Sequence, residues 1–220
     1  MADVISMEKP SSSSILCDKF QINKVKIGGE KSEIPTVLIA SIFYMRHKIV
    51  KNEAEGVFDE EAARRLICHC RENAERLGIG FMLDVIGTTP QALVRYVRFI
   101  QEVSDVPVLI NSTTAEVRIS AIKQLAEANQ LRGVVYNSIN TFGTDEEIDI
   151  LSKLPVEAAV VQTYSIKSKK PDGPLKSIVG SKNSPGLMDK ILRSGITNIM
   201  VDIPILDLSS VGTIGYSARL

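Results

Sequence analysis

The sequence predicts an α/β protein with a TIM-type (β/α) barrel in which about six βα units are present. Apolar runs of about five to eight residues, the usual length of a strand, alternate along the chain with stretches of helical periodicity. Runs that are apolar on both faces and alternate with helices indicate right-handed βαβ units and a parallel sheet covered by helices. Most of these runs also end in a small polar or acidic residue. A barrel gathers such ends at the mouth where its active sites lie.

A doubly wound open sheet is the competing architecture. The dinucleotide fingerprint G-x-G-x-x-G follows none of the apolar runs, and a Gly-rich phosphate loop is absent from the sequence. The barrel is therefore favoured over the open sheet.

The length bears on how much of a barrel is present. The 220 residues suffice for one sizeable core, but a complete barrel typically needs about 250. With a tail and a hairpin set aside, the remaining chain accommodates six units of about 30 residues each. The sequence thus predicts that the last two βα units are lacking, or that another arrangement closes the sheet edges.

The N-terminal part divides into a tail and a hairpin. Residues 1–18 lack periodicity and include four consecutive serines at 11–14, which predicts a flexible tail. Residues 19–220 then form the barrel domain. The apolar residues at 20, 22, 25 and 27, followed by Gly28 and Gly29, predict a short hairpin before the main body.

The main body is expected to contain six strands and five helices. The strands are predicted at residues 36–43, 80–86, 107–111, 133–138, 158–163 and 198–203. Helices are expected to begin where acidic or capping residues stand, namely at Asp59, at Thr89-Pro90, at 112–116 and at Thr144, and a fifth helix is expected over 185–194. Gly195 is the expected C-cap of the last of these helices.

Composition excludes several functional classes. Lys+Arg and Asp+Glu are equal at 26 each, so the chain has no electrostatic footprint for nucleic acid or an anionic membrane. Its apolar stretches are far shorter than the roughly 18–20 residues that span a bilayer. Three cysteines are too few and odd in number for a disulfide framework, and the N-terminus lacks the features of a secretory signal. A cytoplasmic location is therefore expected.

The polar residues at the predicted strand ends form the candidate site. They are Asp84, Asn111, Asn137, Gln162 and Asp202. Carboxylates and carboxamides supply paired acceptors and donors, which suit a planar heterocycle with an amino-pyrimidinone edge. A G-x-S-x-G elbow, an H-E-x-x-H motif and a Ser/His/Asp set are absent, so nucleophilic hydrolysis is disfavoured.

Other chemistries have less support in the sequence. Asp84 and Asp202 could bind a hard metal ion, but a third carboxylate at a strand end is missing. The triplet at 68–70, Cys-His-Cys, lies in a predicted helix whose successive side chains diverge by about 100°, so helix packing is expected and no metal is assigned. His47, in a loop at the same mouth, is read as part of a solvated basic loop or as an anion contact. An aldolase-type enzyme is disfavoured because none of the predicted strands ends in Lys.

Several segments carry a resemblance to a known family. They include KIGG at 26–29, PTVLIASIFY at 35–44, TPQA at 89–92, LINST at 109–113 and VYNSIN at 135–140. Over about residues 20–218, the chain resembles the H subunit of the tetrahydromethanopterin S-methyltransferase complex and its soluble bacterial homologues. The resemblance implies a pterin-binding barrel that moves a methyl group between N5 of a tetrahydropterin and the cobalt of a corrinoid carried by a partner protein.

The resemblance also assigns roles to the strand-end residues. It implies that Asp84, Asn111, Asn137 and Asp202 hold the pterin ring, with Asn111 standing where many relatives have Asp, while Gln162 joins the set from its strand-end position. The catalytic residues stay unassigned. Dimers are common in this class, so the resemblance implies a homodimer as one option. The pterin is expected to be tetrahydrofolate or tetrahydromethanopterin. The alternative function is a non-catalytic fragment that binds the pterin or the corrinoid protein.

Overall fold

The computed structural model describes residues 19–29, 33–164, 170, 172–181, 184–205 and 210–217, so the predicted tail at 1–18 lies outside the described residues. Its centre is a six-stranded parallel sheet. The strands are β3 (Val37–Ile42), β6 (Gly80–Ile86), β7 (Val108–Asn111), β8 (Val134–Asn140), β9 (Ala158–Gln162) and β12 (Asn198–Asp202). Each of the six predicted strands is therefore confirmed, with ends that differ by at most two residues.

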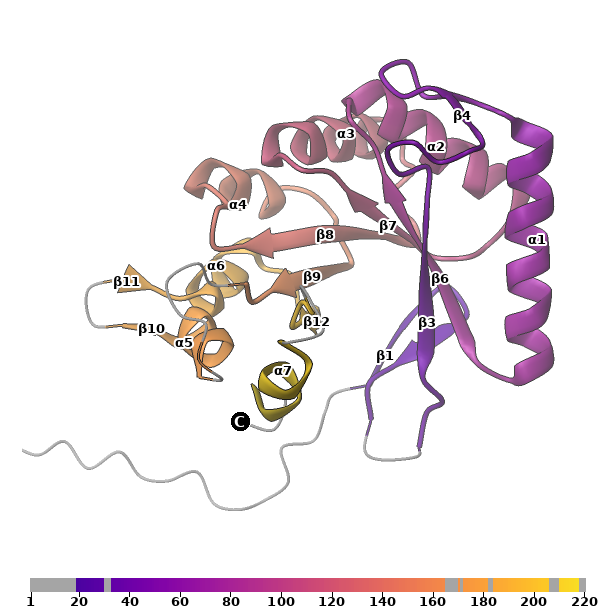
Figure 1. Cartoon of the computed structure of the whole chain (residues 1–220). Helices are drawn as coiled ribbons and strands as arrows, with labels where there is room; N and C mark the ends of the chain where they lie inside the picture. Colours follow the sequence, from indigo (N-terminus) through magenta and orange to yellow (C-terminus); the bar gives the residue numbers. More distant parts are fainter. Residues whose placement is uncertain are drawn as a thin grey trace, which may run out of the picture.

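The order of the strands distinguishes the two architectures. Across the sheet the order is β12-β9-β8-β7-β6-β3, so each strand pairs with its neighbours along the chain. A doubly wound sheet would reverse this order at a switch point. Figure 1 shows the strands fanned into a curled sheet with α1, α2 and α3 along its outer side. The fold is thus an α/β half-barrel of the TIM type, with β3 and β12 at its edges.

Helices follow the strands as expected. They are α1 (Glu60–Leu77), α2 (Pro90–Val103), α3 (Ala115–Glu127), α4 (Asp145–Leu151), α5 (Gly173–Val179), α6 (Leu187–Ser194) and α7 (Val211–Ser217). The side chains of Asp59, Thr89 and Thr144 cap α1, α2 and α4 by accepting hydrogen bonds from backbone N–H groups. Gly195 ends α6 in the left-handed conformation. Among the described helices, none is long and apolar enough to cross a membrane.

The last predicted helix needs a correction at its start. Residues 185–194 were expected to be helical, but Ser184–Pro185 is strand β11, which pairs with β10 (Gly180–Ser181). The helix begins only at Leu187, because extended Gly186 is its N-cap and the Asp189 carboxylate accepts a hydrogen bond from the Gly186 N–H at 3.0 Å. The short hairpin β4 (Val50–Asn52) and β5 (Val57–Phe58) was not predicted either.

The sheet separates two apolar clusters. The larger one fills the space between the sheet and the helices. The smaller one, here called the inner cluster, lies on the concave face and contains Ile22, Met82, Leu109, Val135, Ala158 and Val160. Ile22 belongs to the predicted hairpin, which is confirmed as β1 (Phe20–Ile22) and β2 (Val25–Ile27). The hairpin therefore closes the inner cluster at the end of the half-barrel opposite the strand ends that bear the polar residues.

Gly133 controls how closely this hairpin packs. It has φ +72°, and a Cβ atom there would overlap the side-chain amide of Asn23, whose Nδ2 donates to Asp105 O at 2.9 Å. We expect Gly133→Ala to lower the free energy of unfolding by about 2–4 kcal/mol, from left-handed strain plus overpacking. Gly78→Ala is the matched control, because Gly78 has φ +67° but nothing within 4 Å of the added Cβ. Urea denaturation of both variants checks this, and equal losses would contradict the proposed overlap.

Candidate functional site

The five predicted site residues share one face and one level of the half-barrel. Each of them lies two positions after a residue of the inner cluster or of its margin, so its side chain points to the same concave side. The pairs are Met82 and Asp84, Leu109 and Asn111, Val135 and Asn137, Val160 and Gln162, and Met200 and Asp202. The polar residues thus form a layer above the inner cluster at the carboxyl ends of the strands.

Asp84 is the centre of this layer. This residue is only 9% exposed. Asn137 Nδ2 donates to Asp84 Oδ1 at 2.9 Å, and Asn111 Nδ2 donates to Asp84 Oδ2 at 3.1 Å. The structure therefore brings together three of the predicted residues, from β6, β7 and β8, around one carboxylate.

Ser41 completes the group and was not predicted. Its hydroxyl donates to Asp84 Oδ2 at 3.4 Å from the edge strand β3, where Ser41 pairs directly with Asp84 in register. The sequence contained a signal for it, because Ser41 lies four positions after Val37 and therefore faces the same, inward side of the strand. It was missed because Ser41 stands before the end of the predicted strand rather than at it.

Gln162 and Asp202 form a second pair in the same layer. Gln162 Nε2 donates to Asp202 Oδ2 at 3.1 Å, between strands β9 and β12, which pair in register at these two residues. Asp202 lies close enough to Asp84 for its negative charge to raise the pKa of the Asp84 carboxyl. The predicted set is therefore one layer with two hydrogen-bonded groups.

Burial dominates the electrostatics of Asp84. It raises the pKa of this carboxyl above its ordinary value, while the hydrogen bonds from Asn111, Asn137 and Ser41 act in the opposite direction. The amide NH₂ groups are directed at the carboxylate, which leaves the amide oxygens of Asn111 and Asn137 to accept hydrogen bonds from a ligand. The site is thus a cluster of acceptors that are fixed in place before a ligand arrives.

The metal alternatives gain no support from the geometry. Within the described part of the chain, no three His, Cys, Asp or Glu residues are grouped so that they could hold a metal ion. Cys68 and Cys70 lie within α1, as the periodicity predicts, and Cys70 packs against the larger apolar cluster. His69 contacts Asn73 one turn later, with 3.0 Å between His69 Nε2 and Asn73 Nδ2.

His47 has a local role in the loop after β3. Its Nδ1 accepts a hydrogen bond from the Phe43 N–H at 3.3 Å, and its ring lies 4.4 Å from that of Tyr44. Burial lowers the pKa of His47 below its ordinary value, so the neutral ring that this hydrogen bond needs is favoured. Phe43 itself is buried and stacks on Tyr96, whereas Tyr44 and Met45 are exposed.

A family model and curated relatives of this chain all point to the same protein family. Residues 18–219 match the family model of the tetrahydromethanopterin S-methyltransferase MtrH subunit. The tetrahydromethanopterin S-methyltransferase H subunit of Methanopyrus kandleri is 34% identical over 214 residues, covering 96% of this chain and 66% of the relative. The corresponding H subunit of Methanocaldococcus jannaschii is 35% identical over 187 residues, covering 84% of this chain and 59% of the relative.

These matches extend over nearly the whole chain, although the chain spans only 59–66% of the length of these relatives. The matched region contains the half-barrel and every residue of the polar layer. The chain therefore belongs to the tetrahydromethanopterin S-methyltransferase MtrH subunit family.

Proposed function

We propose that this chain is a methyltransferase that moves a methyl group between N5 of a tetrahydropterin and the cobalt of a corrinoid protein. The observation that supports it most is the buried Asp84 carboxylate with Asn111 and Asn137 donating to its two oxygens. Family membership supports the same reaction class, since the relatives are named as subunits of tetrahydromethanopterin S-methyltransferase.

The acceptor cluster suits the amino-pyrimidinone edge of a pterin. That edge presents adjacent N–H donors in one plane, which a carboxylate oxygen and neighbouring amide oxygens can accept together. Asp84 Oδ1 accepts from Asn137 and has a second acceptor position for a ligand. The oxygens of the two amides would then accept from further N–H groups of the ring, so we propose that Asp84, Asn111 and Asn137 orient the pterin.

Gln162 and Asp202 are proposed to contact the pterin from the other side of the layer. Their hydrogen bond holds the Asp202 carboxylate between β9 and β12. The corrinoid would supply a nucleophilic cobalt that accepts the methyl group. The contribution of this chain is to bind the pterin, to fix its orientation and to exclude competing geometries.

Calorimetric titration tests the proposal. We expect the 220-residue chain to bind tetrahydrofolate or tetrahydromethanopterin with a dissociation constant between about 1 µM and 1 mM, the usual range for substrates. Methyl transfer is then measured from the methylated pterin to reduced free cobalamin by the absorbance of methylcobalamin. Folded protein that binds neither pterin would contradict the proposal.

The transfer assay also separates the main proposal from its alternative. Binding without transfer would favour a fragment that binds the pterin or the corrinoid protein but does not turn over. Because the relatives are named as subunits, we propose that the corrinoid is presented by a separate protein. The homodimer stays a prediction, which the molecular mass in solution can test.

A further inference from the structure

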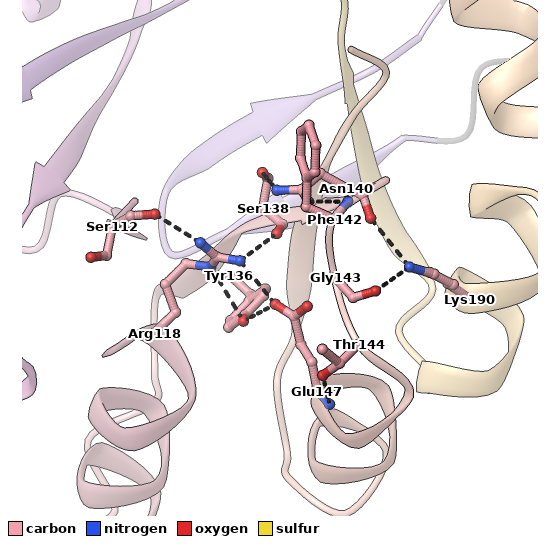
Figure 2. Close-up of polar contacts among 10 residues, drawn as sticks. All are labelled: Ser112, Arg118, Tyr136, Ser138, Asn140, Phe142, Gly143, Thr144, Glu147 and Lys190. Carbon is pink, nitrogen blue, oxygen red and sulfur yellow. Dashed lines mark hydrogen bonds and ion pairs between the residues drawn. The ribbon is translucent and has the colours of Figure 1, made fainter. Parts of the chain in front are cut away.

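A buried polar cluster lies directly behind the acceptor layer. Arg118 of α3, Tyr136 of β8 and Glu147 of α4 meet on the convex side of the sheet, and Figure 2 shows the three side chains directed toward one another. The three residues, taken whole, are 3%, 0% and 0% exposed. Tyr136 immediately precedes Asn137 on β8, so the two side chains point to opposite faces of the sheet.

The Arg118 guanidinium makes four hydrogen bonds in this cluster. Its Nη1 donates to Ser112 O at 2.7 Å, and its Nη2 donates to Ser138 O at 3.2 Å and to Glu147 Oε1 at 3.0 Å. Its Nε donates to the Tyr136 hydroxyl at 3.3 Å, and that hydroxyl donates in turn to Glu147 Oε1. One side chain thus connects α3, the end of β7, strand β8 and α4 (Figure 2).

The two backbone carbonyls that accept from Arg118, those of Ser112 and Ser138, lie next to residues of the polar layer. Ser112 follows Asn111 and Ser138 follows Asn137 in the sequence. Asn111 and Asn137 also pair with each other in the register of β7 and β8. Arg118 therefore holds the backbone of both segments one residue beyond the two amides that donate to Asp84, just after β7 at Ser112 and within β8 at Ser138.

Stability alone does not explain an ion pair in this position. Taking Arg118 and Glu147 out of water is costly, and well-packed apolar residues of the same volume often serve stability as well or better. What the guanidinium adds is a rigid, planar set of donors that fits several acceptors at fixed positions. This is the property needed to fix the spacing of the backbones of β7 and β8 next to Asn111 and Asn137.

We propose that Arg118, held by Glu147 and Tyr136, is a positioning residue that sets Asn111 and Asn137 around Asp84. The consequence for pterin binding rests on the proposed function, whereas the effect on Asp84 itself does not. Arg118 touches no ligand in this scheme and acts through the backbone of β7 and β8.

The segment after β8 is fixed from a second direction. Lys190 of α6 donates to Asn140 O at 3.4 Å and to Gly143 O, and Asn140 Oδ1 accepts from the Phe142 N–H at 2.9 Å (Figure 2). Thr144 then caps α4 by accepting from the Glu147 N–H at 3.1 Å. These contacts fix where α4 begins, and so where the carboxylate of Glu147, in the first turn of that helix, meets Arg118.

The test uses Arg118→Lys, which keeps the charge but loses the fork of donors. The hydrogen bonds from the two amides lower the pKa of Asp84, so loosening them raises the midpoint of the Asp84 carboxyl titration, measured by carbon-13 NMR without any ligand. The side-chain NH₂ signals of Asn111 and Asn137 are expected to shift in the same variant. Affinity for tetrahydrofolate or tetrahydromethanopterin is expected to fall about tenfold, the range of coupling between residues in one network.

Arg193→Lys is the matched control, because Arg193 forms an exposed ion pair with Asp145 on the outer helices. It is expected to leave the Asp84 titration and the affinity unchanged. In an Asn137→Ala background, the effect of Arg118→Lys on affinity is expected to be smaller, because the part that acts through Asn137 is already lost. Should Arg118→Lys not fold, Glu147→Gln tests the same link, because it keeps an acceptor for Arg118 and removes the countercharge.

The outcomes separate this inference from the proposed function. A folded Arg118→Lys protein with an unchanged Asp84 titration and unchanged amide signals would overturn the inference. A shifted titration in a protein whose wild type binds neither pterin would support the inference and overturn the proposed function. A uniform loss of affinity in Arg118→Lys and Arg193→Lys would likewise count against Arg118 as a positioning residue.

Discussion

Asp84→Asn is expected to weaken tetrahydropterin binding by about 100-fold or more. A hydrogen bond to a charged group contributes about 1.5–3 kcal/mol, and the proposed pterin edge donates one to the free acceptor position on Asp84 Oδ1. The substitution also turns an NH₂ group toward Asn111 or Asn137, whose own NH₂ groups now donate to the carboxylate. Calorimetry at pH 7 with tetrahydrofolate and tetrahydromethanopterin measures the loss, and circular dichroism verifies the fold.

Asp105→Asn is the control for this prediction. Asp105 forms an ion pair with Lys24 at the opposite end of the half-barrel, and half of its side chain is exposed. The same chemical change there is expected to leave pterin affinity unaltered. An Asp84→Asn protein that is folded and binds the pterin as tightly as the wild type would contradict the role proposed for Asp84.

The same carboxyl predicts how binding depends on pH. Because burial raises the pKa of Asp84, the free site takes up a proton at a higher pH than an ordinary aspartate, whose pKa is about 3.9. A pterin that donates to the ionised carboxylate competes with this proton, so affinity falls as the pH decreases through the raised pKa. Asp84→Asn is expected to remove this contribution to the pH dependence of binding.

The strands and the polar layer could be predicted because both depend on local pattern. The alternation of side chains along a strand places Asp84 on the same side as Met82 whatever the rest of the fold does. The parallel order of the strands then brings Asn111 and Asn137 to neighbouring positions. Ser41 follows the same alternation. It was not predicted because only residues at the strand ends were considered as site residues.

The cluster behind the sheet could not be predicted in this way. Arg118 and Glu147 stand in helices where charged residues usually face water, and they are 29 positions apart. Their burial follows from how α3 and α4 pack on β8, which is a tertiary property. The helices α5 and α7 were missed for a local reason, because each has seven residues and contains glycine, which disfavours a helix.

Glu147→Ala is expected to lower the free energy of unfolding by about 3–5 kcal/mol, the usual cost of breaking a buried ion pair by removing one partner. The truncation leaves the Arg118 guanidinium buried with no countercharge from Glu147, and it takes away the acceptor of the Tyr136 hydroxyl. Such a loss is a large part of the about 5–15 kcal/mol that stabilises a typical domain. Urea denaturation measures it from the shift of the midpoint at constant slope.

The contrast with Asp145→Ala shows why burial decides the size of this effect. Asp145 begins the same helix and pairs with Arg193, but both side chains are largely exposed, at 77% and 48%. Water solvates Arg193 when its partner is removed, so little stability is lost. Water cannot solvate Arg118 in the same way, because its side chain is only 4% exposed and lies against the sheet. Equal destabilisation by Glu147→Ala and Asp145→Ala would mean that the buried cluster does not hold β7, β8 and α4 together.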